Sequence, residues 1–314
     1  MNNGDSIISQ VKQSWITALS LVIAALAVVA TTGGILTAFG HTHQTFLTLR
    51  GETIRLQGGG LYGHESVSVA AQGVGMDLVT LFVATPLLLL ASYLAARGSL
   101  RGQLLRVAAF WYFTYSYLVI TFGVAYNSFF LIYVALLSAS LAGLILSLLS
   151  VDVGRVTSHM SPRFARRTIA SIVLVISGMF LLLWLGRIVP SIATGAPPIG
   201  LESYTTLSVQ AADLGIVIPL SIVTGILMLR RQSIGYLLAF PVVLFTATMG
   251  LGLVGMVMAM AALGTPVGLA DAVPAVATAV LGLAMSVHLV RNVRQVVPGF
   301  RSAKAGLESR AMSA

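Results

Sequence analysis

The chain has 314 residues, of which 57% are hydrophobic and only 9% are charged, with a mean hydropathy of +0.95. About a quarter of the residues of a soluble domain are charged, so this composition excludes an ordinary soluble protein and indicates a polytopic membrane protein. Cysteine is absent, which excludes disulfides, thiolate catalysis and cysteine-ligated metals. Because each crossing uses roughly 20 apolar residues, no room remains for an independent soluble domain.

Apolar runs predict eight transmembrane helices joined by short connections. In chain order they cover residues 15–39, 76–96, 104–125, 128–150, 167–192, 208–229, 234–262 and 269–291. The segment after the first helix contains "TFLTLRGETIRLQGGG", whose two alternating runs about "RGE" predict a small external β-hairpin. The fold class is therefore an all-α integral membrane protein with one small hairpin. Residues 294–314 are polar and basic, and predict a disordered cytoplasmic tail.

The basic residues gather at alternate connections, and this placement predicts the orientation. If the N-terminus is cytoplasmic, fifteen of the 18 basic residues lie on the cytoplasmic side. Only Arg50, Arg55 and Arg187 then face outward, together with six of the nine acidic residues. The positive-inside rule therefore predicts that both termini are cytoplasmic. The net charge of +9 is explained by topology, so the lipid bilayer is the expected partner and nucleic acid is not.

Two segments resemble one another and suggest an internal duplication. "GLYGHESVSVAAQ" (residues 60–72) and "GLESYTTLSVQAA" (residues 200–212) match at five positions, and an aspartate follows each. The helices that follow lead to similar arginine turns, "ARGSLRGQLL" and "LRRQSIGYLL". We interpret residues 1–150 and 151–293 as tandem four-helix halves related by a pseudo-twofold axis along the membrane normal. The alternative is coincidence, since apolar helices look alike.

Asp77 and Asp213 are the first candidates for a ligand site, each expected at the outer, N-terminal end of its helix. Gln72 and Gln210 lie near them in the two halves. The favoured alternative is helix capping, because free backbone N–H groups and the helix dipole stabilise a carboxylate at a helix N-terminus.

Arg187 is the only basic residue close to an outward helix end. An unpaired charge at membrane depth is costly, so the expected partner is an acidic residue: Asp213, Asp77 or Glu202. The alternative is snorkelling toward the outer headgroups.

The third helix, "FWYFTYSYLVITFGVAYN", carries polar aromatic residues at two depths. Tyr126 and Asn127 lie near its outer end, and Tyr115 and Tyr117 lie deeper. A deep hydroxyl needs a partner, so these tyrosines either line a polar cavity or hydrogen-bond between helices, and we favour the latter. Tyr115, Tyr126 and Asn127 complete the set of candidate ligand-binding residues.

No cofactor or metal site is expected. The loop histidines His41, His43 and His64, with Glu65, could hold a metal, but such residues are more often ordinary polar loop residues. His288 is the only histidine in or near a span, so paired haem ligands are lacking, and no span contains a lysine for a retinal Schiff base.

Glycines and prolines predict close packing and kinks. The runs "GLGLVGM" and "TTGGILTAFG" are typical of helices that approach closely. We expect helix kinks at four prolines within spans: Pro86, Pro219, Pro241 and Pro274.

The stretches "GGLYGHESVSVAAQGVGMDLVTL", "LAARGSLRGQLL" and "FGVAYNSFFLIYVALLSASL" resemble segments of uncharacterised bacterial multi-pass membrane proteins. The resemblance covers about residues 15 to 293. It implies a bacterial cytoplasmic (inner) membrane and carries over no activity and no site residue.

Three classes of function remain. The leading hypothesis is transport or sensing of a small polar or cationic molecule at an outward-facing site between the halves. The second is a structural or accessory subunit of a membrane complex, which would have a closed, dry interior and a protein partner or a homo-oligomeric interface. A membrane enzyme acting on a lipid-like substrate ranks last, because no acid, base and nucleophile set is evident and no catalytic residue is assigned.

Overall fold

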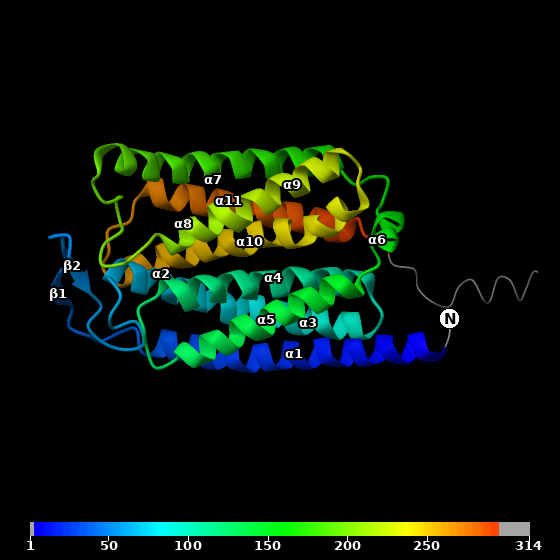
Figure 1. Ribbon diagram of the computed structural model, residues 1–314, viewed down its shortest axis with the longest axis horizontal. Helices are drawn as coiled ribbons and strands as arrows, with labels where there is room; N and C mark the ends of the chain where they lie inside the picture. Colours follow the sequence, from blue (N-terminus) through cyan, green and yellow to red (C-terminus); the bar gives the residue numbers. More distant parts are fainter. Residues whose placement is uncertain (1–2, 295–314) are drawn as a thin grey trace, which may run out of the picture.

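Eight helical segments are long and apolar enough to cross a membrane in the computed structural model, which describes residues 3–294, with side chains from residue 13 onward. The helices run side by side along one axis (Figure 1). The segments are Gln13–Leu36 within α1 (Asn3–Leu36), Val67–Ala96, α4 (Leu100–Gly123), α5 (Phe130–Ser150), α7 (Arg166–Thr194), Ser208–Leu229, α10 (Ser233–Ala262) and α11 (Leu269–Arg291). This is the architecture of a polytopic membrane protein, as the composition predicts. Most of the predicted tail, residues 295–314, lies outside the described residues.

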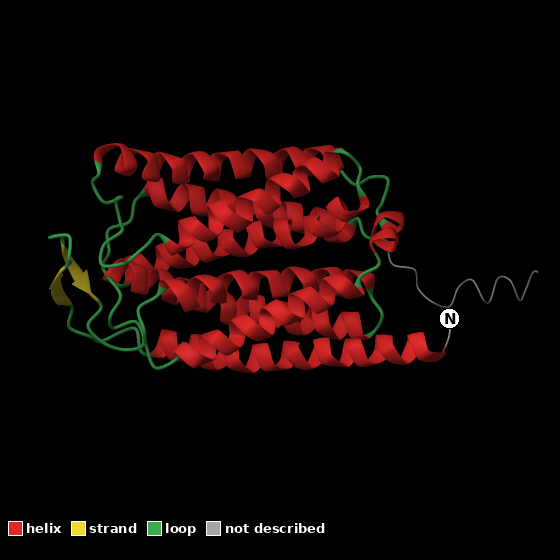
Figure 2. Cartoon of the chain, in the orientation of Figure 1, coloured by secondary structure: helices red, strands yellow, loops and turns green. Residues whose placement is uncertain are grey.

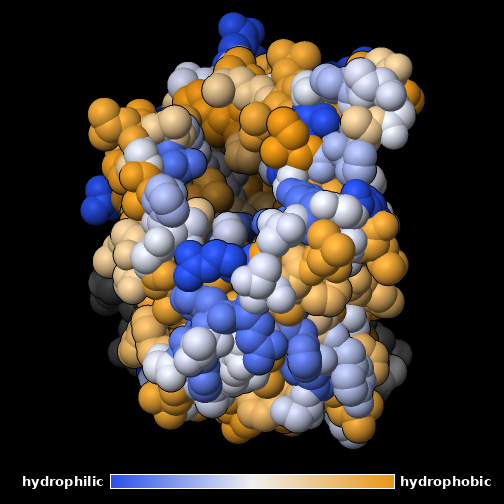
Figure 3. Space-filling view, turned by 90° about the vertical axis from the view of Figure 1, so that its left-hand side faces the viewer, coloured by the Kyte–Doolittle hydropathy of each residue, from blue (hydrophilic) through white to orange (hydrophobic). Residues whose placement is uncertain are grey.

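The two ends of the bundle differ in what they carry. β1 (Gln44–Leu47) and β2 (Thr53–Leu56) pair antiparallel and form a small two-stranded hairpin that projects from one end (Figure 2). Hydrophilic residues gather on the lower part of this end (Figure 3). The start of α1 and the end of α11 lie at the opposite end (Figure 1). A short helix there, α6 (Val153–His159), was not predicted, and Asp152 caps it by accepting from the Gly154 N–H at 2.9 Å.

The second and sixth spans are built alike, each from two α-helices joined by a π-helical turn. The elements are α2 (Val67–Val79), η1 (Thr80–Ala84) and α3 (Thr85–Ala96) in one, and α8 (Ser208–Ala212), η2 (Asp213–Val217) and α9 (Ile218–Leu229) in the other. A proline, Pro86 or Pro219, is the second residue after each π turn.

Proline explains both π turns. It has no N–H to donate to the carbonyl four residues back, and its ring crowds that carbonyl. The residue before each proline instead donates to the carbonyl five residues back, Thr85 to Thr80 and Ile218 to Asp213. Such wider turns occur within otherwise regular helices, frequently at functional sites. The positions of Thr80 and Asp213 at the start of the π turns therefore follow from the positions of Pro86 and Pro219 in the sequence.

The second span begins at Val67, well before the predicted residue 76. Ser66 caps it by accepting from the Val69 N–H at 3.3 Å. The early turns contain serines, glycines and Gln72, so they fall below the hydropathy of an apolar run. They form a helix because α2 packs along α10, where a side chain at Gly75 would collide with the backbone of Gly255.

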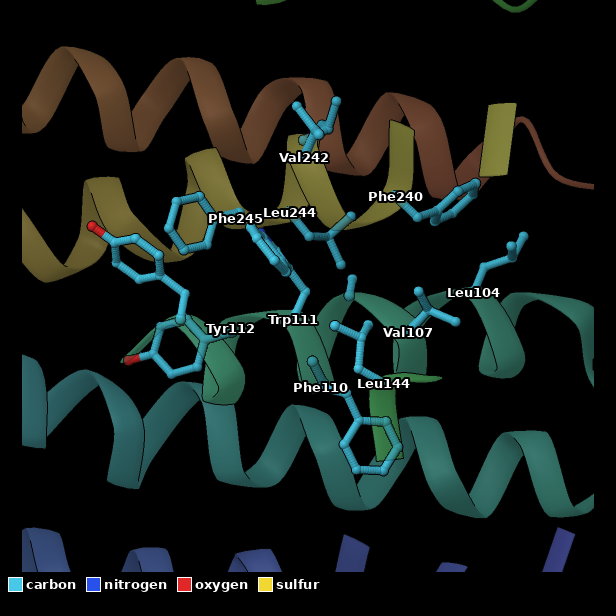
Figure 4. Packing of buried hydrophobic residues seen from close by; sticks show 14 of the residues in the cluster. Leu104, Val107, Phe110, Trp111, Tyr112, Leu144, Phe240, Val242, Leu244 and Phe245 are labelled. Carbon is cyan, nitrogen blue, oxygen red and sulfur yellow. The ribbon is translucent and has the colours of Figure 1, made fainter. Parts of the chain in front are cut away.

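The central pair of spans, α4 and α10, is the most buried. Their facing side chains form one apolar cluster, in which Trp111 of α4 points toward Phe245 and Leu244 of α10 (Figure 4). The Trp111 and Phe245 ring centroids are 6.0 Å apart. Lipid tails are as apolar as these side chains, so helices in a membrane associate through close packing rather than through water exclusion.

Glycines provide that close packing on the other side of α10, as the "GLGLVGM" run predicts. A side chain at Gly250 would collide with the Ala279 backbone of α11, and one at Gly282 of α11 would lie 2.5 Å from the Ala247 nitrogen. The backbones of α10 and α11 are therefore in close contact at a glycine of each helix.

Adding one methyl group at Gly282 should force α10 and α11 apart. We expect Gly282→Ala to cost about 1–3 kcal/mol of stability through overpacking, seen as a lower unfolding midpoint of the purified protein. Gly178→Ala in α7 is the matched control, since nothing lies within 4 Å of a methyl group there. Equal midpoints for the two variants would show that the contact is not tight.

Candidate functional site

A cavity of about 380 Å³ lies inside the bundle, lined by residues of the second, third, fifth, sixth and seventh spans and by Thr278 of α11. Its volume is in the range of small-molecule sites. The helix α7 packs on α9 and has at most slight contact with α11. The first helix, α1, by contrast packs on two neighbours, α3 and α5. Tyr62, Glu65 and Arg187 lie among its lining residues at the hairpin end. That surface is hollowed near its centre, with apolar side chains in the hollow (Figure 3).

The cavity brings together most of the residues that the sequence singles out. Six of the eight candidates line it: Asp77, Asp213, Arg187, Gln72, Gln210 and Tyr115. The other two are not among the lining residues. Tyr126 is 78% exposed, and the Asn127 side-chain oxygen accepts from the Phe129 N–H at 2.9 Å in the turn before α5. Both follow the end of α4 at Gly123, so they no longer share its cavity-facing side.

Asp77 lies inside the second span, not at its start, so helix capping is wrong for this residue. Its side chain is 5% exposed, and the carboxylate accepts a hydrogen bond from the Tyr62 hydroxyl at 2.7 Å. Burial, together with the Asp77 carboxylate, raises the pKa of the Tyr62 phenol well above 10.0, so the phenol stays protonated as a donor. Gly34 of α1 makes room for the carboxylate, because a side chain there would collide with Asp77 Oδ2.

Asp213 opens the π turn η2, and its carboxylate also binds side chains rather than capping a helix. Oδ1 accepts from the Tyr115 hydroxyl of α4 at 2.6 Å, and Oδ2 accepts from the Trp184 indole N–H of α7 at 2.9 Å. Trp184 was missed by the sequence analysis. The available signal was an indole N–H within an apolar span, which needs an acceptor when buried.

The two π turns make corresponding contacts with α4. Thr80 Oγ1, at the start of η1, lies 2.8 Å from the Tyr112 hydroxyl, as Asp213 lies next to Tyr115. Tyr115 therefore does both things considered for it: it hydrogen-bonds between helices and lines the cavity. Tyr117 instead stacks on Phe113, with ring centroids 6.2 Å apart.

Arg187 does not bind the acidic partners expected for it. Its Nε donates to the Ile199 carbonyl at 2.7 Å, in the connection that follows α7. A side chain at Gly200 would collide with the guanidinium, so the glycine makes room for it. The expected partnership with Asp213, Asp77 or Glu202 is wrong, because the guanidinium takes its acceptor from the backbone of the connection after α7.

Glu65 joins three connections at the hairpin end and was missed as a cavity residue. It is 1% exposed and accepts from the Ala125 N–H at 2.5 Å and from the Tyr204 hydroxyl. Burial raises the pKa of Glu65, and the hydrogen bond from Tyr204 opposes that rise. Burial also raises the pKa of Tyr204, so the phenol remains a donor. The segments before α2, before α5 and before α8 are thereby held together beside the cavity.

Among the residues that the structure describes, no group of three histidine or acidic side chains could hold a metal ion. Comparisons with protein-family models, with curated proteins and with solved structures find no match for this chain. No residue role is therefore transferred from a relative.

Glu65→Gln should flatten the pH dependence of thermal stability. Because burial raises the pKa above 4.5, the native state holds a proton that the unfolded chain releases. The stabilisation is complete below about pH 4.5, the ordinary value, and is lost as pH rises through the raised pKa. The unfolding midpoint of the wild type should thus fall relative to that of Glu65→Gln as pH rises toward neutral.

Glu52→Gln makes the identical change on the exposed hairpin turn and is the matched control. Parallel curves for the wild type and Glu65→Gln would contradict the assignment of this pH dependence to Glu65.

Tyr62→Phe should destabilise the protein by about 1–3 kcal/mol, because it removes a donor from a buried carboxylate. Tyr126→Phe removes the same hydroxyl from a side chain that is 78% exposed, and should leave the unfolding midpoint unchanged. If the two variants unfold alike, the hydrogen bond to Asp77 contributes nothing to stability.

Proposed function

We propose that this protein binds a small molecule in the cavity between its two halves and takes part in the transport or sensing of that molecule. The observation that carries the proposal is the convergence of Asp77 and Asp213, from different spans, on one cavity of about 380 Å³. Their described hydrogen-bond donors, Tyr62, Tyr115 and Trp184, are neutral. A mostly apolar cavity with a few convergent polar groups is the usual form of a ligand site.

The cavity favours ligand handling over a purely structural role. An accessory subunit was expected to have a closed, dry interior. Larger apolar side chains could fill this cavity if no ligand entered it. Close-packed interiors contain few voids larger than a water molecule, so a cavity of this volume calls for an occupant.

We also propose that the halves are tandem repeats. Aligning Pro86 with Pro219 matches the two π turns and also the turns at the ends of α3 and α9. This alignment shifts the chain by 133 residues, whereas the match of residues 60–72 with 200–212 needs a shift of 140, so those five identities do not support it. The Ser99 N–H donates to the Leu94 carbonyl at 3.1 Å, and the Gln232 N–H donates to the Leu227 carbonyl at 2.9 Å. In this alignment Asp77 corresponds to Gln210, and Asp213 corresponds to Thr80. The two aspartates are therefore about one helical turn from equivalence, and they make the cavity asymmetric.

The proposed location is a bacterial cytoplasmic membrane, with both termini in the cytoplasm and the hairpin outside. The basic connections support this orientation, since they belong to the end where the chain begins and where α11 ends (Figure 1). The cavity mouth would then face outward. The two π turns would supply the backbone joints for a change between open and closed states, because proline has already removed a helical hydrogen bond at each.

Thermal unfolding of the detergent-purified protein against a panel of small molecules, ions and lipids tests the function. A ligand that binds only the native state, at about a hundred times its dissociation constant, stabilises the fold by about 2.7 kcal/mol. We expect at least one compound to raise the unfolding midpoint of the wild type, and the double variant Asp77→Asn, Asp213→Asn to lose that response.

The matched control is the double variant Asp152→Asn, Asp271→Asn, which removes two carboxylates that cap helices outside the cavity. It should keep the response. A panel without any shift, or a shift that survives the loss of Asp77 and Asp213, would count against a ligand site in this cavity.

A further inference from the structure

The charges around the cavity are unbalanced. Three carboxylates, those of Asp77, Glu65 and Asp213, line it together with one guanidinium, that of Arg187. Arg187 donates to the Ile199 carbonyl, and within the described part of the chain its hydrogen bonds include none to a carboxylate. Acidic side chains therefore outnumber basic ones in the lining, and the one guanidinium is directed at a backbone carbonyl.

Asp213 is the carboxylate best placed to meet a ligand. Both aspartates line the cavity, but Asp213 is half-buried, whereas Asp77 is 5% exposed and its Oδ2 is close to Tyr62 and Gly34. Each Asp213 oxygen accepts one hydrogen bond, from Tyr115 or from Trp184. A carboxylate has about four lone-pair sites, so the two neutral donors orient the group and leave acceptor capacity on the cavity side.

Aromatic and apolar side chains surround this carboxylate. Trp184, Tyr115, Phe180 and Phe245 line the same cavity, and the Tyr115 and Phe245 rings meet edge to face with centroids 4.7 Å apart. Thirteen further lining residues have aliphatic or methionine side chains. Aromatic faces attract organic cations, and apolar walls accept a hydrocarbon body.

We propose that the ligand is an amphiphilic organic cation, such as a protonated amine with a hydrophobic body, whose charged group binds Asp213 among Trp184 and Tyr115. This assignment rests on the proposed function and names its ligand class. The cation supplies the charge that the cavity lacks, and its desolvation is offset by a carboxylate and aromatic faces in a site of low dielectric constant. The apolar wall then selects for the body of the ligand.

Other ligand classes fit the cavity less well. A Ca²⁺ or Mg²⁺ ion takes six or more oxygen ligands, but the residues next to Asp213 are donors that already point their hydrogens at its carboxylate. An anion would meet three carboxylates. A neutral apolar molecule would contact the apolar walls and give the Asp213 carboxylate no hydrogen-bond donor or charge partner.

Three probes with the same hydrocarbon body test the charge preference: phenylbutylamine, phenylbutanol and phenylbutyrate. Their affinities are measured by calorimetry on the protein in lipid nanodiscs at neutral pH, with empty nanodiscs subtracted. We expect the amine to bind at least about tenfold more tightly than the alcohol, as a charge-assisted hydrogen bond predicts, and the carboxylate probe to bind most weakly.

Asp213→Asn should reduce the affinity for the amine to that for the alcohol while leaving the alcohol unchanged. Asp213→Glu keeps the charge and should keep the preference, and Asp271→Asn, outside the cavity, should bind all three probes like the wild type. If Asp213→Asn does not fold, the comparison of probes on the wild type still decides the charge preference.

Binding of the alcohol or the carboxylate probe as tight as that of the amine would overturn the ligand class and leave the cavity as a ligand site. A preference for the amine that persists in Asp213→Asn would overturn the role of Asp213. If none of the three probes binds, the cation assignment fails, whereas the proposed function fails only if the wider panel of compounds also produces no thermal shift.

Discussion

A carboxylate inside a bundle of apolar helices needs hydrogen-bond donors, because an unpaired buried charge is costly. Asp77 and Asp213 impose this demand on the rest of the structure. Asp77 accepts a hydrogen bond from Tyr62, which connects the segment after the hairpin to the second span. Asp213 joins α4 and α7 through Tyr115 and Trp184. Hydrogen bonds on two sides of the cavity are therefore arranged about two acidic groups.

Proline and glycine decide where those groups can sit. Pro86 and Pro219 remove a helical hydrogen bond in the second and sixth spans, and the π turns that result place Thr80 and Asp213 against tyrosines of α4. Glycines at Gly75 and Gly282 bring α10 into backbone contact with α2 and α11. Close packing on these sides and slight contact between α7 and α11 together leave the cavity where the acidic groups converge.

The connections at the hairpin end are joined to one another by hydrogen bonds to one buried residue. Glu65 is buried and accepts from Ala125 and Tyr204, which belong to two other connections. Because the hydrogen bonds of Glu65 depend on one titrating carboxyl group, the connections beside the cavity mouth are linked to pH through a single residue. In the proposed orientation this buried group lies at the external end of the bundle.

The amino-acid sequence by itself determines the eight spans, the hairpin and the close glycine contacts, because each depends on local composition and spacing. It also predicts six of the cavity residues, since polar groups are rare in apolar spans and stand out. The start of the second span at Val67 was missed because packing on α10, rather than hydropathy, makes those turns helical. Only the tertiary structure decides the partners: Tyr115 and Trp184 reach Asp213 from other spans, and Arg187 turns to a backbone carbonyl instead. Hydrogen-bond partners in a helical bundle come from segments far apart in the chain, and their choice depends on how the helices rotate and cross, which no local pattern specifies.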